Sequence, residues 1–486
     1  MGIFKSLREK SAIIRFLVNA QKTVWYPILF AALSIFSGTN DHTVYLPILY
    51  LLCSFVLFSV LFTDDNKVFL TPLLMIFYSL GFDNPPESFA SSNGDMLASF
   101  DPNAFKKIIV CAVITVGAFI IRLIVDGSVR AAFKRSSLLS WSILGLAAAY
   151  ILNGIFSPSY SFSNLLYGLF IAFGITAVYF LAHGMLERST GVLPYACQIL
   201  VCLSYTVLSQ VLIISYRAIQ DGRFFVGNPA RINRYCFFLS WGVATVIGAV
   251  LVLGIPAALY LAKNHKHSWL SFLSAILFFG GAALINTRSA LLVGGFILFI
   301  CIILCCVHGH KKLANLINLL LFVILPAALI FIFALRPEAS CDFIEKLINS
   351  FKHDRGDSGR IEIWNNGIAD FLSAPVFGVG FSDGGFDNEE FNNIFSPMYH
   401  CIGIEFLGAT GIFGCLAFAF HLVSLATLFF KRFTVNKMML FMIPAMIIGM
   451  SIVDNFFFYL NFQIIYSAFL AIIEKQREVL PASQKS

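Results

Sequence analysis

Long apolar runs recur along the whole chain and are separated by short polar segments. About 20 helical residues cross the roughly 30 Å apolar layer of a bilayer, so runs of that length predict membrane-spanning helices. The third run is short and only the tripeptide VDN separates the last two, which leaves twelve to fourteen crossings. The predicted spans are residues 23–38, 44–63, 68–82, 106–125, 138–156, 162–182, 192–216, 236–262, 268–285, 289–309, 313–335, 400–429, 437–453 and 455–473.

Composition agrees with a chain that is surrounded by lipid. Of 486 residues, 58% are hydrophobic and 12% are charged, so most helices would be apolar on every side, which excludes a water-soluble globule. The predicted fold class is an all-α polytopic membrane protein, with the lipid bilayer as a partner. The eleven cysteines lie mostly inside spans without paired spacing, which argues against a disulfide or metal framework.

Basic residues assign the two sides of the membrane. Lys and Arg gather in the loops on the side of the two ends of the chain, so the positive-inside rule places both termini in the cytoplasm. The opening sequence MGIFKSLREKSAIIRF is basic and lacks a cleavage site, so we expect a retained cytoplasmic leader and first anchor. The net charge of +7 fits basic loops beside anionic lipid and predicts no nucleic-acid partner.

Polar segments divide the chain into three predicted parts. Residues 1–335 hold the N-terminal spans with a short external loop at 217–235. Residues 336–399 form a long external loop, and residues 400–486 hold the C-terminal spans and a cytoplasmic tail. A loop of this length is either functional or disordered, and the helical patterns within it favour a folded functional segment.

Two helices are expected within the long loop. Apolar residues at helical spacing in CDFIEKLINSFKH predict a helix that lies at the membrane interface. A second helix is expected to begin at an N-cap supplied by Asp357 or Ser358 and to end at about Ser373, where a Pro and Gly turn follows.

The short external loop RAIQDGRFFVGNPARINRY is rich in arginine. Arg223, Arg231 and Arg234 flank the turn sequence GNP, on the side of the membrane where the positive-inside rule predicts few cations. Two interpretations remain open. The arginines either contact lipid headgroups or bind an anionic substrate.

Two further arginines are expected in the first turns of helices at the external surface. Arg360 opens the second loop helix, and Arg288 follows the capping residues Asn286 and Thr287 in INTRSALLVGGF. A cation there opposes the helix dipole at a cost of about 0.3–1 kcal/mol unless an anion is bound. Helix N-termini and arginine forks both bind phosphate, so two such sites suggest a diphosphate. The alternative is that each arginine reaches water or pairs with a neighbour such as Glu362.

A histidine stands where the long loop enters an apolar run, in SPMYHCIGIEFLGATGIFG. Residues eleven apart on a helix are about three turns apart, so His400 and Gly411 are expected to share a face, with Gly408 near it. Small residues there would let another helix approach closely. An imidazole at the membrane surface could accept a proton, although a capping or interfacial histidine is the commoner case.

The acidic run FSDGGFDNEEFNN lies just before this histidine. The carboxylates of Asp383 and Asp387, with Glu389 and Glu390, could bind a polar substrate, or they could form a solvated edge. No Asp-x-Asp pair occurs on the external side, so we expect no divalent metal and no cofactor.

These motifs, in this order, resemble the O-antigen polymerase and O-antigen ligase superfamily of bacterial inner-membrane glycosyltransferases. The similar segments are TRSALL after an apolar span, Arg360 followed after three residues by Trp364, the turn APVFGVGF, and His400 with ten residues between it and Gly411. The segment GNPAR also looks like the shorter external loop of the family. The resemblance covers roughly residues 220–430. Relatives commonly have Asn directly after the histidine, where this chain has Cys401.

The resemblance implies a fold, a reaction and a site. It implies a C-type glycosyltransferase arrangement of many membrane helices with a catalytic periplasmic loop, in the bacterial inner membrane. Undecaprenyl-diphosphate-linked glycan would be the donor, and a glycan or lipid A core would offer the acceptor hydroxyl. Arg288 and Arg360 would hold the leaving diphosphate, and His400 would take the proton from the attacking hydroxyl. A chain-length regulator protein is a further implied partner.

Three activities are compatible with these features. The number of spans and the length of the chain resemble those of polymerases, so O-antigen polymerase is our first expectation. Ligation of polysaccharide to lipid A core is the alternative. A flippase for lipid-linked oligosaccharide would require polar residues deep in the spans, where Arg122 is the clearest charge and can reach water from the cytoplasmic end.

Overall fold

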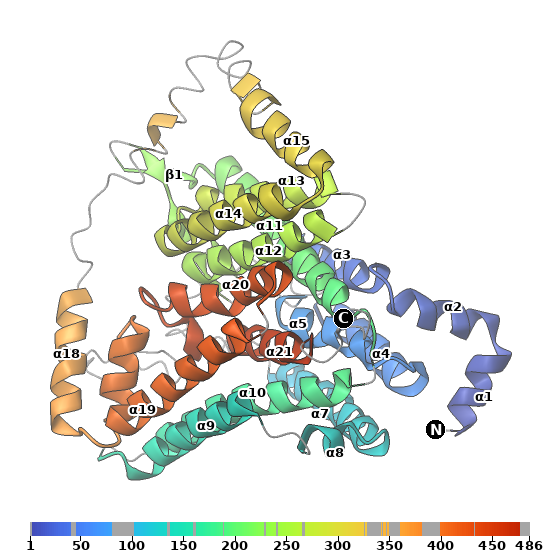
Figure 1. Ribbon diagram of the computed structural model, residues 1–486, viewed down its shortest axis with the longest axis horizontal. Helices are drawn as coiled ribbons and strands as arrows, with labels where there is room; N and C mark the ends of the chain where they lie inside the picture. The colour runs from blue at the N-terminus through green and yellow to red at the C-terminus, as the bar shows by residue number, and fades with distance from the viewer. Residues whose placement is uncertain are drawn as a thin grey trace.

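A computed structural model of the chain is almost entirely helical (Figure 1). The structure describes residues 2–39, 45–79, 102–133, 137–158, 162–187, 189–227, 230–239, 242–264, 268–324, 326–327, 342, 344–346, 348, 360–381, 399–431 and 433–476.

The first half of the chain contains helices and two short hairpins. The elements are α1 (Gly2–Lys10), α2 (Ala12–Gln21), α3 (Trp25–Thr39), α4 (Tyr45–Phe62), the 3₁₀ turn η2 (Asn66–Phe69), α5 (Leu70–Ser79), α7 (Pro102–Val125), α8 (Ser128–Phe133), α9 (Leu138–Phe156), α10 (Phe162–Leu186), α11 (Val192–Gln220), β1 (Phe225–Val226), β2 (Arg231–Ile232), η3 (Arg234–Cys236), β3 (Phe238–Leu239) and β4 (Gly242–Val243).

The regular elements of the second half, among its described residues, are helices. It comprises α12 (Ala244–Asn264), α13 (Ser268–Ile285), α14 (Arg288–His308), α15 (Lys311–Leu319), the π-helical turn η4 (Leu320–Ile324), α18 (Arg360–Ser373), α19 (Ile402–Phe430), α20 (Val435–Met450), η6 (Phe456–Phe458) and α21 (Leu460–Gln476).

The predicted all-α polytopic fold is confirmed. Among the described residues, six helices are long and apolar enough to cross a membrane: Leu138–Phe156, Asn164–Leu186, Val192–Gln220, Ala244–Asn264, Arg288–His308 and Ile402–Phe430. Shorter apolar helices occupy most of the other predicted spans, whereas the total of twelve to fourteen crossings stays a prediction. Two of the predicted spans need comment. The span at 236–262 starts late, because Phe238–Leu239 and Gly242–Val243 pair as strands β3 and β4. Most of the second half of 313–335 lies outside the described residues.

The apolar core lies between the helices. Eighteen of the residues of α12 are buried, because this helix is surrounded by α11, α13, α14 and α20. In contrast, α7 and α14 expose Val113, Ile121, Leu292 and Phe296, as expected of helix faces that contact lipid. The sequence periodicity does not separate these two environments, because apolar residues cover all sides of both kinds of helix.

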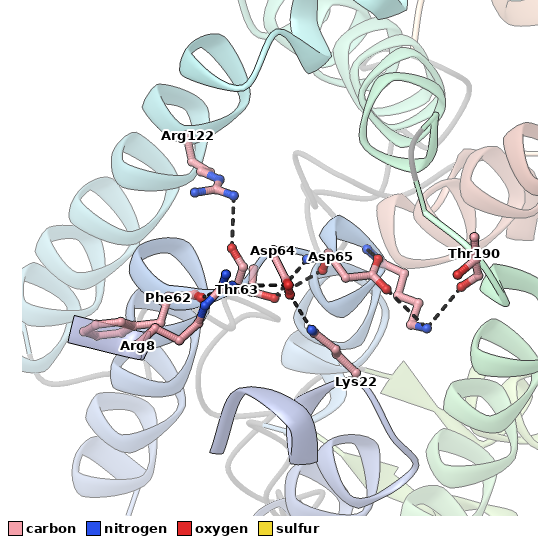
Figure 2. Close-up of polar contacts among 9 residues, drawn as sticks. Arg8, Lys22, Phe62, Thr63, Asp64, Asp65, Arg122 and Thr190 are labelled. Atoms are coloured by element: carbon pink, nitrogen blue, oxygen red, sulfur yellow. Dashed lines mark hydrogen bonds and ion pairs between the residues drawn. The ribbon is translucent and has the colours of Figure 1, made fainter. Parts of the chain in front are cut away.

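The carboxylate of Asp64 pairs with two basic residues of the N-terminal segment, one on α1 and one directly after α2 (Figure 2). Arg8 Nη1 lies 3.3 Å from Asp64 Oδ2, and Lys22 forms an ion pair with the other oxygen. Nearby, Arg122 donates to the carbonyl of Thr63 at 3.0 Å, and its side chain is only 13% exposed. Arg122 is thus bound to the backbone of the connection between α4 and η2, and its access to water stays a prediction.

Helix α19 is broken at Gly411, which corrects the expectation that His400 and Gly411 share one helix face. Gly411 has φ 64° and ψ −162°, so the chain changes direction there. Because of the break, the carbonyls of Gly408 and Ala409 and the amides of Ile412 and Phe413 lose their regular helical partners.

The segment Ala374–Phe381, which we call the strap, supplies the missing partners. The amides of Val379 and Gly380 donate to Gly408 and Ala409, each at 3.0 Å. On the other side of the break, the amides of Ile412 and Phe413 donate to the strap carbonyls of Pro375 and Val376, at 2.9 and 3.1 Å. The turn APVFGVGF of the sequence is thus built into the broken helix.

Helices α9 and α10 hold the strap from its other side. Asn153 donates its side-chain amide to the carbonyl of Phe377, and Ser157 donates its hydroxyl to that of Val379. Asn164 accepts a hydrogen bond from the amide of Phe381 at 2.8 Å. These bonds give partners to the carbonyls of Phe377 and Val379 and to the amide of Phe381, as burial requires.

Candidate functional site

His400 lies two residues before the start of α19. Its side chain pairs with Asp454, a residue that sequence analysis did not select. Its Nδ1–H donates to Oδ1 of Asp454, 3.2 Å away. The Asp454 side chain is 10% exposed and that of His400 is 40% exposed. Asp454 Oδ1 also accepts from the amide of Asn455 at 2.9 Å, which fixes the carboxylate.

This pair can support proton transfer. The hydrogen bond from Asp454 raises the pKa of His400 above its usual 6.5, burial lowers it, and the charge of Asp454 raises it further. With Nδ1 committed to Asp454, Nε2 is the ring nitrogen that remains to accept a proton. The carboxylate would stabilise the imidazolium that results.

Arg360 is the first residue of α18, as expected, and it lies close enough to act electrostatically on His400. Its positive charge lowers the pKa of His400, against the effect of Asp454. Figure 1 shows α18 at one end of the bundle, next to α19 and across the direction of α9. Within the described residues Arg360 forms no ion pair with Glu362, the alternative that sequence analysis left open.

The contact between α18 and α19 depends on two glycines. A Cβ at Gly367 would lie 2.4 Å from Cγ2 of Ile404, and a Cβ at Gly408 would lie 2.9 Å from the carbonyl oxygen of Gly367. The expected close approach at Gly408 therefore occurs, and it brings α18 against α19. At Gly411 the close neighbour is instead the strap carbonyl of Val376, 2.6 Å from a built Cβ.

Arg288 is the first residue of α14, preceded by the N-cap Thr287, as expected. Thr287 packs on the opening turn of α12, since a Cβ at Gly248 would lie 2.2 Å from its Oγ1. One turn and a half into α14, Val293 lies 3.6 Å from a Cβ built on Gly449, near the end of α20.

These contacts place the start of α14 at the end of the bundle that holds Asp454. Lys263, at the end of α12, donates to Asn436, at the start of α20, so these two helices are antiparallel. The start of α14 lies beside the start of α12, and therefore beside the end of α20. The loop that follows α20 carries Asp454, so Arg288, Asp454 and His400 gather at one end.

The short arginine loop contains one hairpin, β1–β2, and a second hairpin, β3–β4, follows it. Phe225 pairs with Ile232 and Phe238 with Val243. Arg223 pairs within its own loop, with Nη2 lying 2.7 Å from Asp221 Oδ2.

The other two arginines of this loop lie farther along it. Arg231 is on β2, and Arg234 lies over the ring of Tyr235, at 5.5 Å. Lys346 of the long loop lies over the ring of Phe225, at 4.7 Å, so the long loop and the short arginine loop meet there. A substrate role for Arg223, Arg231 and Arg234 stays a prediction.

Some predicted residues cannot be placed. Asp383 and Asp387 lie outside the described residues, as do the expected caps Asp357 and Ser358. Among the described residues, no group of three His, Cys, Asp or Glu side chains is arranged to hold a metal ion.

Sequence analysis missed the buried acidic groups. Asp454 belongs to the VDN tripeptide, which we used only as a boundary between spans. Glu405 is fully buried in the first turn of α19, and Glu474 is buried near the end of α21, where it pairs with His183 at 2.8 Å. The signal was present, because a carboxylate beside or within an apolar run is costly unless it has a partner.

A comparison of the sequence with known protein families gives one match. Residues 273–419 match the family described as O-antigen ligase. The matched stretch runs from α13 into α19 and contains Arg288, Arg360, the strap and His400, whereas Asp454 and the arginine loop lie outside it. A search of the curated proteins finds no match.

Proposed function

We propose that this chain, a multi-pass membrane protein with an O-antigen ligase family domain at residues 273–419, is an O-antigen polymerase. Its donor would be a glycan on undecaprenyl diphosphate, its acceptor a sugar hydroxyl of a second lipid-linked glycan, and its site would face the periplasm. The family implies a transferase of lipid-linked glycans. The identity of donor and acceptor is our inference.

The observation that carries the proposal is the pair formed by His400 and Asp454 beside Arg360. In the proposed step, the acceptor oxygen attacks the anomeric carbon and its proton passes to Nε2 of His400. The bond between that carbon and the diphosphate oxygen breaks, and the diphosphate leaves with the electron pair. Asp454 stabilises the imidazolium that forms.

Arg360 and Arg288 would hold the diphosphate. Each is the first residue of a helix, so a phosphate bound there meets both free backbone N–H groups and a guanidinium fork. The charge on the leaving group grows as the glycosidic bond breaks, and fixed donors then stabilise the transition state more than the ground state. The positive charge of Arg360 also lowers the pKa of His400, which favours the neutral imidazole that can accept a proton.

The same chemistry would serve a ligase, which differs in the acceptor. We favour polymerase because the number of apolar runs exceeds that of a typical ligase. A flippase is less well supported. The buried carboxylates of Glu405 and Glu474 accept hydrogen bonds from neighbouring helices or loops, which ties them to the fold.

The acceptor decides between these activities. Purified protein in lipid nanodiscs would receive undecaprenyl-diphosphate-linked repeat units, with and without lipid A core. A polymerase forms a ladder of longer lipid-linked glycans from repeat units alone. Transfer that occurs only with lipid A core would favour a ligase, and the absence of any glycan transfer in both conditions would contradict the proposed function.

A further inference from the structure

His400 has a backbone conformation that side-chain-bearing residues rarely adopt. Its φ is +49°, in the left-handed region. Such a conformation persists only where the surrounding structure over-determines it, and it concentrates at functional sites. The chain is held after His400 by the amide of Ile402, which donates to the carbonyl of Ser451 at 2.7 Å. Before His400, the chain is held by the contacts of Tyr399.

Tyr399 is fixed at three separate atoms. Its amide donates to Glu405 Oε2 at 3.0 Å, and its carbonyl accepts from the indole Nε1–H of Trp364 at 3.1 Å. Its hydroxyl donates to Asp370 Oδ2 at 2.6 Å. The Tyr399 side chain is only 1% exposed, so these bonds lie in an environment where an unmet polar group is costly.

Two of the three bonds come from α18. Trp364 is one turn after Arg360, and Asp370 lies farther along the same helix. Between them, a Cβ at Gly367 would lie 2.9 Å from Cδ1 of Tyr399, so the tyrosine ring packs directly on the helix. The helix that begins with Arg360 is thus bonded at two points to the residue that precedes His400.

We propose that Trp364 and Asp370 are positioning residues that clamp Tyr399 to α18 and thereby fix the spacing between Arg360 and His400. The inference rests on the proposed function, because that spacing matters only if both groups act on one substrate. Misplacement of a reacting group by about 1 Å can cost about 100-fold in rate. A clamp at Tyr399 would fix the position of Arg360 relative to His400.

The clamp predicts an effect on the titration of His400 that packing alone would not give. The charged groups that act on His400 are Asp454 from the loop after α20, Arg360 from α18 and Glu405 from α19. If the clamp is released, Arg360 moves away from His400 and the lowering effect of its charge weakens, so the pKa of His400 rises further.

Two conservative variants test this with little loss of volume. Trp364→Phe removes the N–H that reaches Tyr399, and Tyr399→Phe removes the hydroxyl that reaches Asp370. Trp269→Phe is the matched control, because Trp269 lies on α13 and is 49% exposed. Two variants of Asp370 separate the loss of the negative charge from the loss of the hydrogen-bond acceptor. Asp370→Asn loses the charge but keeps an oxygen that can accept from the tyrosine, whereas Asp370→Leu loses both.

Two readouts apply to each variant in nanodiscs. The first is turnover of undecaprenyl-diphosphate-linked repeat units, for which we expect a loss of about tenfold or more in kcat with little change in KM. The second is the pH midpoint for carbethoxylation of His400 by diethyl pyrocarbonate, which needs no turnover. We expect this midpoint to rise in Trp364→Phe, Tyr399→Phe and Asp370→Leu, and to stay near the parent value in Asp370→Asn and Trp269→Phe.

The outcomes are separable. Parent-like turnover, or an unchanged midpoint, in Trp364→Phe and Tyr399→Phe would overturn the clamp. If instead the parent protein transfers no glycan, or His400→Ala transfers it at the parent rate, the proposed function fails while the carbethoxylation midpoint still tests the clamp.

Discussion

The imidazole of His400 and the carboxylate of Asp454 lie 3.2 Å apart, although 53 residues and two helices separate them in the chain. The base must be neutral to accept a proton, and its pKa is raised above 6.5 by the bond to Asp454. We therefore expect kcat/KM to rise with pH through this raised pKa. Asp454→Asn should move the inflection to lower pH and reduce the plateau rate, as measured by pH–rate profiles.

The same pair links folding to pH. A histidine whose folded pKa is raised contributes stability that is fully present below its unfolded pKa and is lost as pH rises through the folded pKa. The thermal midpoint of the parent should thus decline relative to that of Asp454→Asn as pH increases from about 6 to 8. An inflection that is identical in the two proteins would contradict a functional link between His400 and Asp454.

Arginine at both helix starts should not be replaceable by lysine. Arg288→Lys and Arg360→Lys each keep the charge but lose the planar fork, so we expect turnover to fall by about 10²–10³. Expression and thermal stability should be close to those of the parent, because both side chains lie at the ends of helices. Arg130→Lys, at an exposed position on α8, is the control. Full activity of both test variants would remove the diphosphate role.

The break in α19 should be sensitive to a single methyl group. Gly411→Ala places a Cβ 2.6 Å from the carbonyl oxygen of Val376 in a conformation that L-residues avoid. Backbone strain of this kind costs about 1–3 kcal/mol, so we expect a lower thermal midpoint and a strap that detaches from α19.

Gly403 provides the matched control on the same helix. A Cβ at Gly403 meets no atom within 4 Å, and Ala is favoured over Gly inside a helix by about 0.5–1 kcal/mol. Gly403→Ala should therefore be as stable as the parent or slightly more so. Equal stability of the two alanine variants would mean that the break is not required by the fold.

The sequence predicted the positions of the helices better than the contacts between segments of the chain. Apolar runs located α9, α13 and α14 within one or two residues, because every span must satisfy its own backbone and so forms a helix. The break at Gly411 was not predictable from periodicity, since an apolar run looks the same on both sides of it. The strap that repairs the break is distant in sequence, and its turn residues alone do not indicate where it binds.

The site was predictable in part for a related reason. Arg288, Arg360 and His400 stand at polar-to-apolar boundaries, where a charge is conspicuous in the sequence. Asp454 also stands at such a boundary, but its role depends on the loop after α20 reaching the start of α19. That pairing is tertiary, so only the structure could supply the partner of His400.

The predicted topology remains to be tested, and one pair of cysteines would do so. In a variant without native cysteines, Arg234→Cys in the hairpin loop should react in intact cells with a membrane-impermeant maleimide. Lys431→Cys, at the opposite end of α19 from His400, should react only after the cells are permeabilised. Reaction at Lys431→Cys and none at Arg234→Cys in intact cells would reverse the proposed orientation.

The most direct test of His400 as the base is the single-turnover rate of glycan transfer in nanodiscs, measured for the parent and for His400→Ala. Donor labelled in the sugar is mixed with excess protein, and formation of the longer lipid-linked glycan is followed with time. A positioned general base contributes about 10²–10⁴ in rate, so the variant should be slower by that factor while it binds the donor with nearly unchanged affinity. Transfer by correctly inserted His400→Ala at the parent rate would contradict the account.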